Sequence, residues 1–278
     1  MKTKRSDFGV LLLCAAMLLV AGFATGAGQL VIDGSTTVGP IADAWAEVFQ
    51  AMHPDLNITV QKTGSGNGIA ALIDGRADVG MSSRFMRPSE FKQAVENDVY
   101  PVAHVVAMDG VCVVLHPSNP VEDLTLAQVR DIYAGRITNW QQVGGPNMSI
   151  VVVSRDTSSG TYGSFSDAVM GQDRMAGSVE YVNSNPQAHA RVRNTRGAIG
   201  YVGVGFLDAH VKPVKLNGVA PTNRTIANGQ YPIARAQYMF TNGFPELGSV
   251  VHRYVTFYLT PLGHELVESA GFVPLTDY

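Results

Sequence analysis

Short runs rich in aliphatic and β-branched residues alternate with helical patterns along most of the chain, starting near Gln29. Residues 30–33 and 58–61 have the composition of strands. Between them, from Pro40 onward, apolar residues recur every three or four positions, which is the spacing of an amphipathic helix. Alternation of strands and helices is typical of a parallel or mixed sheet flanked by helices. The sequence therefore predicts an α/β protein.

The alternation continues beyond residue 61 and predicts two lobes. Further strands are expected at 77–81, 150–153 and 198–202, and further helices at 68–73, 88–97, 126–134, 161–170, 187–193, 250–259 and 263–269. The β-rich stretch at 102–115 is long enough to pass from one lobe into another. We therefore predict a first part of lobe I at 28–113, lobe II at 114–206, and a return to lobe I at 207–278.

The N-terminus resembles an export signal, predicted to span residues 1–27. Three basic residues lie within the first five positions, residues 10–20 are apolar, and small residues follow at Ala24 and Ala27. The apolar run is shorter than the ~20 residues that a membrane-spanning helix needs. We expect cleavage near Ala24 or Ala27 and a periplasmic or extracytoplasmic location, with a retained N-terminal anchor as the alternative.

Composition narrows the functional classes. Hydrophobic residues make up 46% of the chain and charged residues 15%, which excludes a disordered or coiled-coil protein. Asp and Glu (23) outnumber Lys and Arg (20), so neither nucleic acid nor an anionic membrane is an expected partner. Cys14 falls in the predicted signal, and Cys112 lies in an apolar run that predicts a core position. The seven His are scattered, so neither a metal site nor a cofactor is predicted.

Four polar loops follow predicted strands, and they carry most of the chemical information. They are rich in Gly, Ser and Thr and lie at 34–37, 64–68, 82–84 and 155–161. In an open α/β sheet, ligands bind where strands end and helix N-termini present unpaired N–H groups. Such loops suit a small oxyanion, although each of them alone could be an ordinary turn or helix cap.

Nucleotide-binding and hydrolytic patterns fit these loops poorly. The first loop has the outer spacing of a P-loop, but Pro40 and Ile41 stand where Lys and Ser or Thr are required. The GxGxxA spacing at 66–71 lacks the acidic residue expected after the next strand. Ser159 has neither a G-x-S-x-G elbow nor a nearby base in the sequence. An enzyme is therefore disfavoured.

Several segments together resemble the periplasmic phosphate-binding proteins of ABC phosphate importers, the PstS-like family. The segments that carry the resemblance include DGSTTVGPIADAW, QKTGSGNGIAALIDGRADVGMSSR, DLTLAQVRDIYAGRITNW, SRDTSSGT and GAIGYV. The resemblance implies a type II periplasmic-binding-protein fold, with two lobes that close on a hinge over one inorganic phosphate ion. It also implies delivery of that ion to an ABC transporter permease in the cytoplasmic membrane, without catalysis. We expect a monomer.

The resemblance also assigns ligand contacts to particular residues. Thr36 and Thr37 match the contacts of the first loop and Ser65 that of the second, while four residues of the loop at 155–161 match those of lobe II. With neighbouring polar residues, the predicted ligand-binding set is Ser35, Thr36, Thr37, Ser65, Ser82, Ser83, Arg84, Asp109, Arg155, Ser159, Gly160 and Thr161.

One position departs from the family pattern. The best-known members carry an aspartate after the third strand that accepts the phosphate proton, whereas this chain has Ser83 followed by Arg84. We expect Asp109 to be the substitute. Phosphate near pH 7 keeps a proton that it can donate and sulfate does not, so a fixed carboxylate would select phosphate over sulfate. The alternative is that Asp109 only forms an Asp-Gly turn.

Three other functions are compatible with parts of this sequence analysis. The same fold could bind sulfate, molybdate or tungstate, and an exported enzyme on this fold could hydrolyse phosphate esters. A structural or adhesive surface protein would bind no anion.

Overall fold

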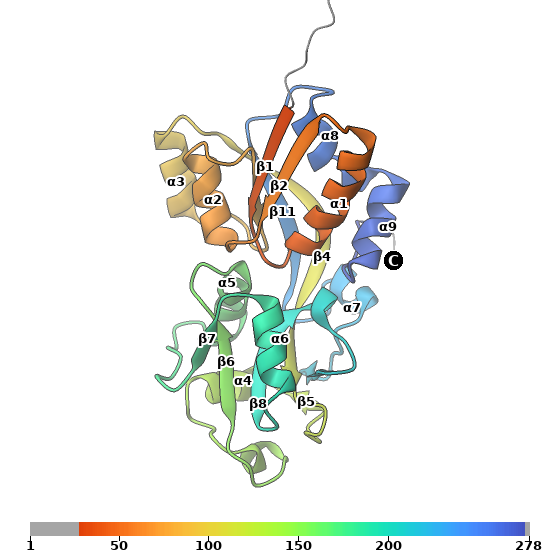
Figure 1. Ribbon diagram of the computed structural model, residues 1–278. Coiled ribbons are helices and arrows are strands. Elements are labelled where there is room, and N and C mark those ends of the chain that lie inside the picture. The colour runs from red at the N-terminus through yellow and green to blue at the C-terminus, as the bar shows by residue number, and fades with distance from the viewer. Residues whose placement is uncertain (1–27, 276–278) are drawn as a thin grey trace, which may run out of the picture.

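The computed structural model describes residues 28–275. It has two α/β lobes, which lie one above the other in Figure 1. The predicted export signal falls outside the described residues. Within residues 28–275, no helix is both long and apolar enough to cross a membrane. The predicted fold class is confirmed.

A mixed sheet runs through both lobes in the order β2-β1-β3-β11-β4-β8-β6-β7, with β9 also paired to β4. The strands of lobe I are β1 (Gly28–Gly34), β2 (Leu56–Gln61), β3 (Val79–Ser82) and β11 (Ala234–Asn242). Those of lobe II are β5 (Asp123–Leu124), β6 (Val151–Arg155), β7 (Glu180–Val182), β8 (Ala198–Gly203), β9 (Lys212–Pro213) and β10 (Lys215–Leu216). The long strand β4 (Pro101–Leu115) belongs to both lobes.

Strand β4 changes partner along its length, and this change marks the crossover between the lobes. Up to Gly110 it pairs antiparallel with β11 of lobe I, and from Val111 it pairs antiparallel with β8 of lobe II. Because one continuous strand serves both lobes, a small change of twist near this point can rotate one lobe against the other. The change of partner, between Gly110 and Val111, lies within the β-rich stretch 102–115.

Helices cover the sheet in each lobe. Lobe I carries α1 (Gly39–Met52), α2 (Ser65–Ile73), α3 (Pro88–Glu96), α8 (Val250–Val255) and α9 (Pro261–Ser269). Lobe II carries α4 (Leu126–Tyr133), α5 (Gly160–Phe165), α6 (Asn185–Arg193) and α7 (Asn223–Ala227). A π-helical turn, Ser166–Met170, continues α5.

Each lobe has its own hydrophobic core. In lobe I, Trp45 and Phe49 of α1 meet the C-terminal helices through edge-to-face contacts with Tyr254 and Phe257. In lobe II, Phe165 stacks on Tyr201 with their ring centroids 4.0 Å apart. Separate cores let the lobes move as two rigid bodies about the crossover.

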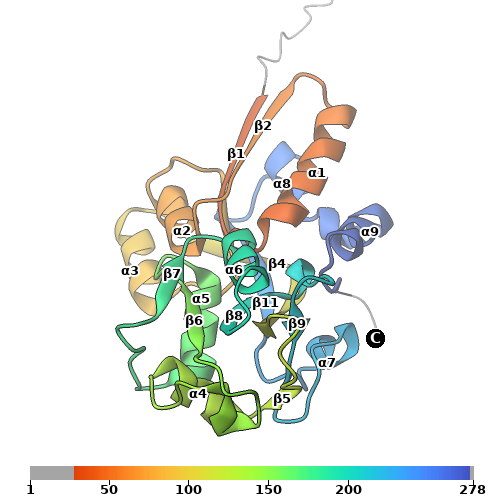
Figure 2. The same ribbon diagram turned by 60° about the horizontal axis from the view of Figure 1, so that its bottom comes forward.

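The return to lobe I starts later than the sequence indicates. Residues 207–233 were predicted to belong to lobe I, but β9 pairs with the lobe II end of β4, and Ile226 of α7 and Tyr231 are buried in the lobe II core. Figure 2 shows α7 and β9 beside that end of β4. The prolines and glycines of this segment interrupt the strand and helix patterns, so its short elements were not predicted. The chain returns to lobe I with β11, which begins at Ala234.

A close backbone contact fixes the first two polar loops. A Cβ atom on Gly68 of α2 would overlap the backbone of Asp33 and Gly34 at the end of β1. Glycine at this position therefore lets the start of α2 lie directly against the loop that leads into α1.

We predict that Gly68→Ala lowers the free energy of unfolding by about 1–3 kcal/mol, because the backbone atoms cannot move aside as a side chain could. Chemical denaturation measures this change. Gly177→Ala is the matched control, because a Cβ atom there would meet nothing within 4 Å. Equal stability of the two variants would contradict the close contact.

Candidate functional site

A small polar cavity lies between the lobes, where β1, β3 and β6 end. Its wall consists of Ser35, Thr36, Thr37, Gly64, Ser65, Ser83, Arg155, Ser159, Gly160 and Thr161. Nine of the twelve sequence-predicted residues are thus brought together by the fold. The wall carries seven hydroxyl side chains and one charged group, the guanidinium of Arg155.

The first loop turns its hydroxyl groups toward lobe II. Ser35 Oγ accepts the N–H groups of Thr37 (3.1 Å) and Val38 (3.2 Å), which holds the turn between β1 and α1. Thr36 and Thr37 are buried and both contact lobe II side chains. The local sequence folds this way because Pro at the second position of α1 needs no backbone donor there.

The second and third loops meet α5 of lobe II. Ser65 Oγ accepts the N–H of Ser83 at 3.1 Å and lies 3.3 Å from the Ser83 hydroxyl. A Cβ atom on Gly160 would overlap Ser65 and come within 2.6 Å of Ser83 Oγ. Glycine at position 160 thus allows the start of α5 to approach both serines.

Arg155 enters the cavity from the end of β6 and is 1% exposed. Its Nη2 donates to the carbonyl oxygen of Asn183 (2.7 Å) and to Thr36 Oγ1 (3.3 Å), and its Nε donates to the carbonyl of Val182 (3.3 Å). Its Nη1 is buried and has no hydrogen-bond partner in the described structure.

No carboxylate of residues 28–275 forms an ion pair with Arg155. Burial lowers the pKa of this guanidinium to about 10, so it stays positively charged at neutral pH. A buried charge without a partner is costly, and an anion in the cavity would remove that cost.

Hydrogen bonds across the cavity show that the lobes are closed. The hydroxyls of Thr37 and Thr161 lie 3.0 Å apart, and Asn185 Nδ2 donates to Thr37 Oγ1 at 2.8 Å. At the rim, the N–H of Gly66 donates to the carbonyl of Ser158 at 2.9 Å. The two halves of the wall therefore reach a central ion at the same time in this arrangement.

Two predicted residues of the third loop lie outside the wall. Ser82 Oγ donates to the carbonyl of Arg84. The Arg84 guanidinium forms two hydrogen bonds with the carboxylate of Glu90, at 2.6 and 2.8 Å. Glu90 lies six residues after Arg84 and outside the loop, so no residue within the loop indicated that Arg84 is neutralised.

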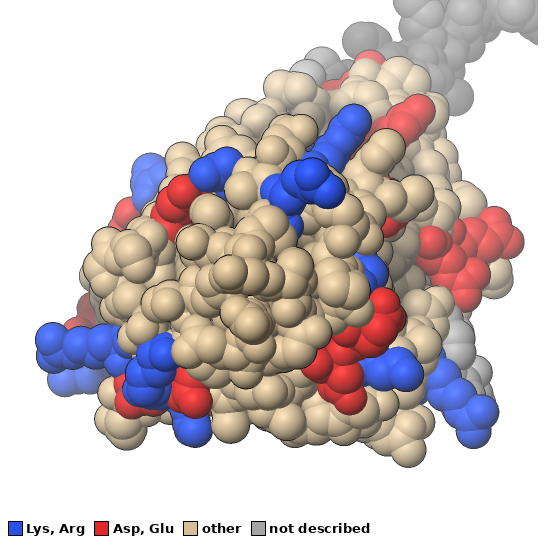
Figure 3. All heavy atoms as spheres, turned by 90° about the horizontal axis from the view of Figure 1, so that it is seen from below, with Lys and Arg blue, Asp and Glu red and all other residues tan. Residues whose placement is uncertain are grey.

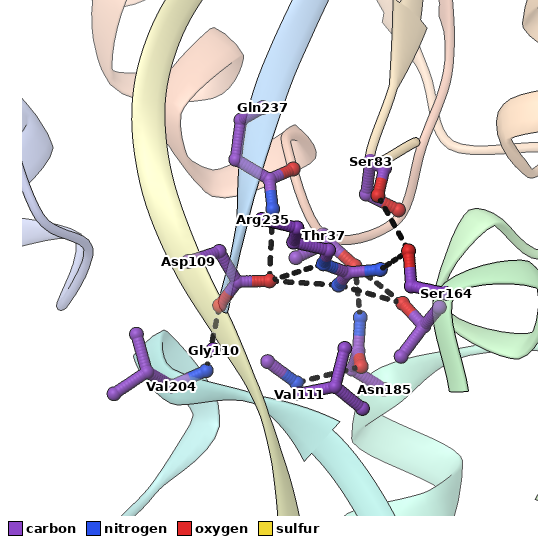
Figure 4. A network of polar contacts seen from close by, with 12 residues as sticks. Thr37, Ser83, Asp109, Gly110, Val111, Ser164, Asn185, Val204, Arg235 and Gln237 are labelled. Atoms are coloured by element: carbon purple, nitrogen blue, oxygen red, sulfur yellow. Dashed lines mark hydrogen bonds and ion pairs between the residues drawn. The ribbon is translucent and has the colours of Figure 1, made fainter. Parts of the chain in front are cut away.

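Asp109 also lies outside the wall, because it sits at the crossover with its carboxylate already occupied (Figure 4). Its Oδ2 accepts hydrogen bonds from Nε (2.9 Å) and Nη2 (2.7 Å) of Arg235 and from Gln237 Nε2 (2.8 Å), while Oδ1 accepts the N–H of Val204 (2.8 Å). Burial raises the pKa of this carboxyl and Arg235 opposes the rise. In the closed structure this carboxylate therefore does not face the ligand cavity.

Four residues around the cavity were missed by the sequence analysis. Gly64 lines the wall, Asn185 donates to both threonines of the first loop, and Arg235 and Gln237 hold Asp109. The pattern SNP at 184–186 is a helix-start signal that could have pointed to Asn185. Arg235 follows a Pro-rich segment in which no strand was predicted, so no sequence signal placed it at the site.

The arrangement of lobes and cavity matches known proteins. A family model described as the PBP superfamily domain matches residues 20–260. The phosphate-binding protein PstS of Borreliella burgdorferi is 30% identical, over 87% of this chain and 88% of its own length. The chain belongs to the PstS-like family. PstS of Bacillus subtilis is 29% identical to it, over 99% of this chain and 96% of its own.

Solved structures agree with this family membership. A phosphate ABC transporter substrate-binding protein of Clostridium perfringens, crystallised with bound phosphate, has a TM-score of 0.82 and 32% identity; the match covers 90% of this chain and all of that one. An ABC-type phosphate transport receptor of Vibrio cholerae has a TM-score of 0.72 and 32% identity, over 88% and 99%. The PstS-like family thus accounts for the two-lobed type II architecture.

We predict that Arg155→Gln weakens oxyanion binding by about 10- to 150-fold, because it removes a charge-assisted contact worth about 1.5–3 kcal/mol. Without ligand, the free energy of unfolding should be at least that of the wild type, since an uncompensated buried charge is lost. Calorimetric titration and chemical denaturation measure the two effects.

The matched control for this prediction is Arg191→Gln, which removes a guanidinium paired with Glu180 on the surface of lobe II. It should bind anions as the wild type does. Unchanged affinity in Arg155→Gln would remove Arg155 from the binding site.

Proposed function

We propose that this protein captures inorganic phosphate in the cavity between its lobes and delivers it to an ABC transporter permease in the cytoplasmic membrane. The observation that carries the proposal is the buried guanidinium of Arg155, which lines a closed cavity rich in hydroxyl groups and whose Nη1 has no hydrogen-bond partner among the described residues. Relatives named as phosphate-binding proteins, and a related structure with bound phosphate, point to the same ligand.

The chemistry of the cavity suits a small tetrahedral oxyanion, because short polar side chains from both lobes line it. The seven hydroxyls and the Arg155 fork can replace the water shell of such an ion. Hydroxyl oxygens also accept hydrogen bonds, so a protonated phosphate oxygen finds an acceptor among them.

Binding is coupled to closure because the donors come from both lobes. Thr36, Thr37 and Ser65 belong to lobe I, whereas Arg155 and Thr161 belong to lobe II. An ion that contacts both sets binds the closed form more tightly than the open form and therefore shifts the population toward closure. A permease could then distinguish the loaded protein from the empty one by shape.

We infer a binding protein without catalysis. The wall contains hydroxyl groups that could serve as nucleophiles, but no His, Lys, Asp or Glu that could activate them lines the cavity. Hydrogen bonds between the lobes close over the cavity, an arrangement that favours a small ion over a larger phosphate ester. Turnover of such an ester would favour the hydrolase alternative.

The location and partners follow from the family and from the N-terminal segment. We infer that the protein is exported across the cytoplasmic membrane and is a monomer. Its macromolecular partner is a permease and not a nucleic acid. In the view from the lobe II end, positive and negative side chains alternate around the rim, and no broad basic area covers this face (Figure 3). Such a surface is unsuited to binding a polyanion.

The proposal predicts that phosphate raises the melting temperature of the protein more than sulfate, molybdate or tungstate does. An ion that binds the folded state alone stabilises it by about 2.7 kcal/mol at a concentration one hundred times its Kd. A thermal-shift series with the four anions measures this. No response to any of them would overturn the proposed function, and a larger response to another oxyanion would reassign the ligand.

Asp109→Asn, titrated with phosphate and sulfate, extends this test to ligand selection. A carboxylate that accepts the phosphate proton would, when lost, lower the ratio of phosphate to sulfate affinity. A carboxylate that holds Arg235 would, when lost, change both affinities by the same factor. Its four hydrogen bonds lead us to expect the second result. A lower ratio would restore the role predicted from the sequence.

A further inference from the structure

Arg235 and Asp109 form a buried ion pair at the crossover between the lobes. They face each other as Cα partners in the antiparallel pair of β11 and β4, two residues before β4 takes up its partner in lobe II. The side chain of Arg235 is 7% exposed and that of Asp109 is fully buried. An ion pair so placed is held in one geometry by the backbone of both crossing strands.

The guanidinium of Arg235 also reaches lobe II. Its Nη2 donates to Thr161 Oγ1 at 3.1 Å. Its Nη1 donates to Ser164 Oγ at 3.3 Å (Figure 4). Both acceptors lie on α5, the helix that starts at the cavity wall. One side chain of β11 therefore connects the crossover to lobe II.

Both acceptors face lobe I and lie between the lobes. Thr161 Oγ1 is 3.0 Å from the hydroxyl of Thr37, and Ser164 Oγ donates to the carbonyl of Ser83 at 3.4 Å. Movement of α5 away from lobe I breaks these contacts together with those to Arg235. The bonds from Arg235 to α5 are thus a property of the closed arrangement.

The bond to Thr161 also sets what that hydroxyl can do. A hydroxyl has two lone pairs and one proton, and Arg235 fills one of the lone pairs. The remaining lone pair and the proton are then left for Thr37 and for an ion in the cavity. Asn185 does the same for Thr37 from the other side, at 2.8 Å. Together, these two N–H donors orient the hydroxyl pair that faces the ligand.

We propose that Arg235 is a positioning residue that latches the closed form and orients Thr161 toward the bound anion. This inference rests on the proposed function, because it assumes that an anion binds as the lobes close. Asp109 acts through Arg235: with Gln237 and the N–H of Val204, it fixes the direction of the guanidinium fork. A lysine cannot replace this fork, since a single ammonium group cannot reach Asp109, Thr161 and Ser164 in the same planar geometry.

The test compares phosphate association and dissociation rate constants in the wild type and in Arg235→Lys, measured by stopped-flow mixing. The latch forms after the ion has entered, so we expect the association rate constant to change by less than about threefold. The dissociation rate constant should rise at least tenfold. A residue that only stabilises the fold would lower the melting temperature without this selective change in dissociation.

Two further variants keep the test decisive. Ser164→Ala removes one of the Arg235 contacts to lobe II and leaves the buried ion pair intact, so it decides the matter if Arg235→Lys fails to fold. It should raise the dissociation rate constant by a smaller factor. Arg191→Lys, which changes the surface guanidinium paired with Glu180, is the control and should match the wild type.

The outcomes separate the two proposals. Phosphate binding by the wild type, with wild-type dissociation in both Arg235→Lys and Ser164→Ala, would overturn the latch and leave the proposed function standing. Failure of the wild type to bind phosphate would overturn both. Faster dissociation in these two variants, with an unchanged control, would support the latch.

Discussion

The arrangement of the site depends on one unpaired positive charge. Arg155 is held by two backbone carbonyls and one threonine hydroxyl, no carboxylate of residues 28–275 forms an ion pair with it, and its Nη1 has no hydrogen-bond partner among these residues. Burial lowers the pKa of this guanidinium to about 10, although the charge of the neighbouring Asp156 opposes the shift. The surrounding hydroxyls are neutral and cannot cancel the positive charge. A small anion can, and this requirement connects fold, closure and function.

The two buried arginines near the cavity therefore have different roles. Arg235 is neutralised by Asp109, and its remaining N–H groups turn to lobe II hydroxyls. Arg155 keeps its charge for the ligand. One guanidinium is thus committed to the crossover and the other to the cavity. The continuous strand β4 makes this possible, because it places Asp109 where the lobes meet.

Much of this architecture follows from the sequence. The alternating strand and helix patterns predicted the α/β class, and the polar loops after β1, β3 and β6 predicted where a ligand would lie, because parallel strands end at one edge. The loops that carry Ser35 and Ser65 belong to lobe I and the loop that carries Ser159 belongs to lobe II, and closure of the lobes brings all three to one cavity. The family resemblance, carried by these same loops, is confirmed by the comparisons with known proteins.

Other features could not be predicted because they depend on tertiary contacts. The sequence showed no partner for Arg84 within its loop, but in the structure its guanidinium pairs with Glu90 of the next helix, α3. Asp109 was expected to bind the ligand, but strand β11, which was not predicted, places Arg235 opposite it. Segment 207–233 was assigned to the wrong lobe because its short elements are stabilised by packing against lobe II instead of by local patterns.

A crystal structure of the protein grown with phosphate tests the central claim most directly. The account predicts closed lobes and a phosphate ion in the cavity, with one of its oxygens within hydrogen-bond distance of Arg155 Nη1. An ion held elsewhere, or a cavity in which Arg155 Nη1 is paired with a carboxylate of the chain, would contradict it.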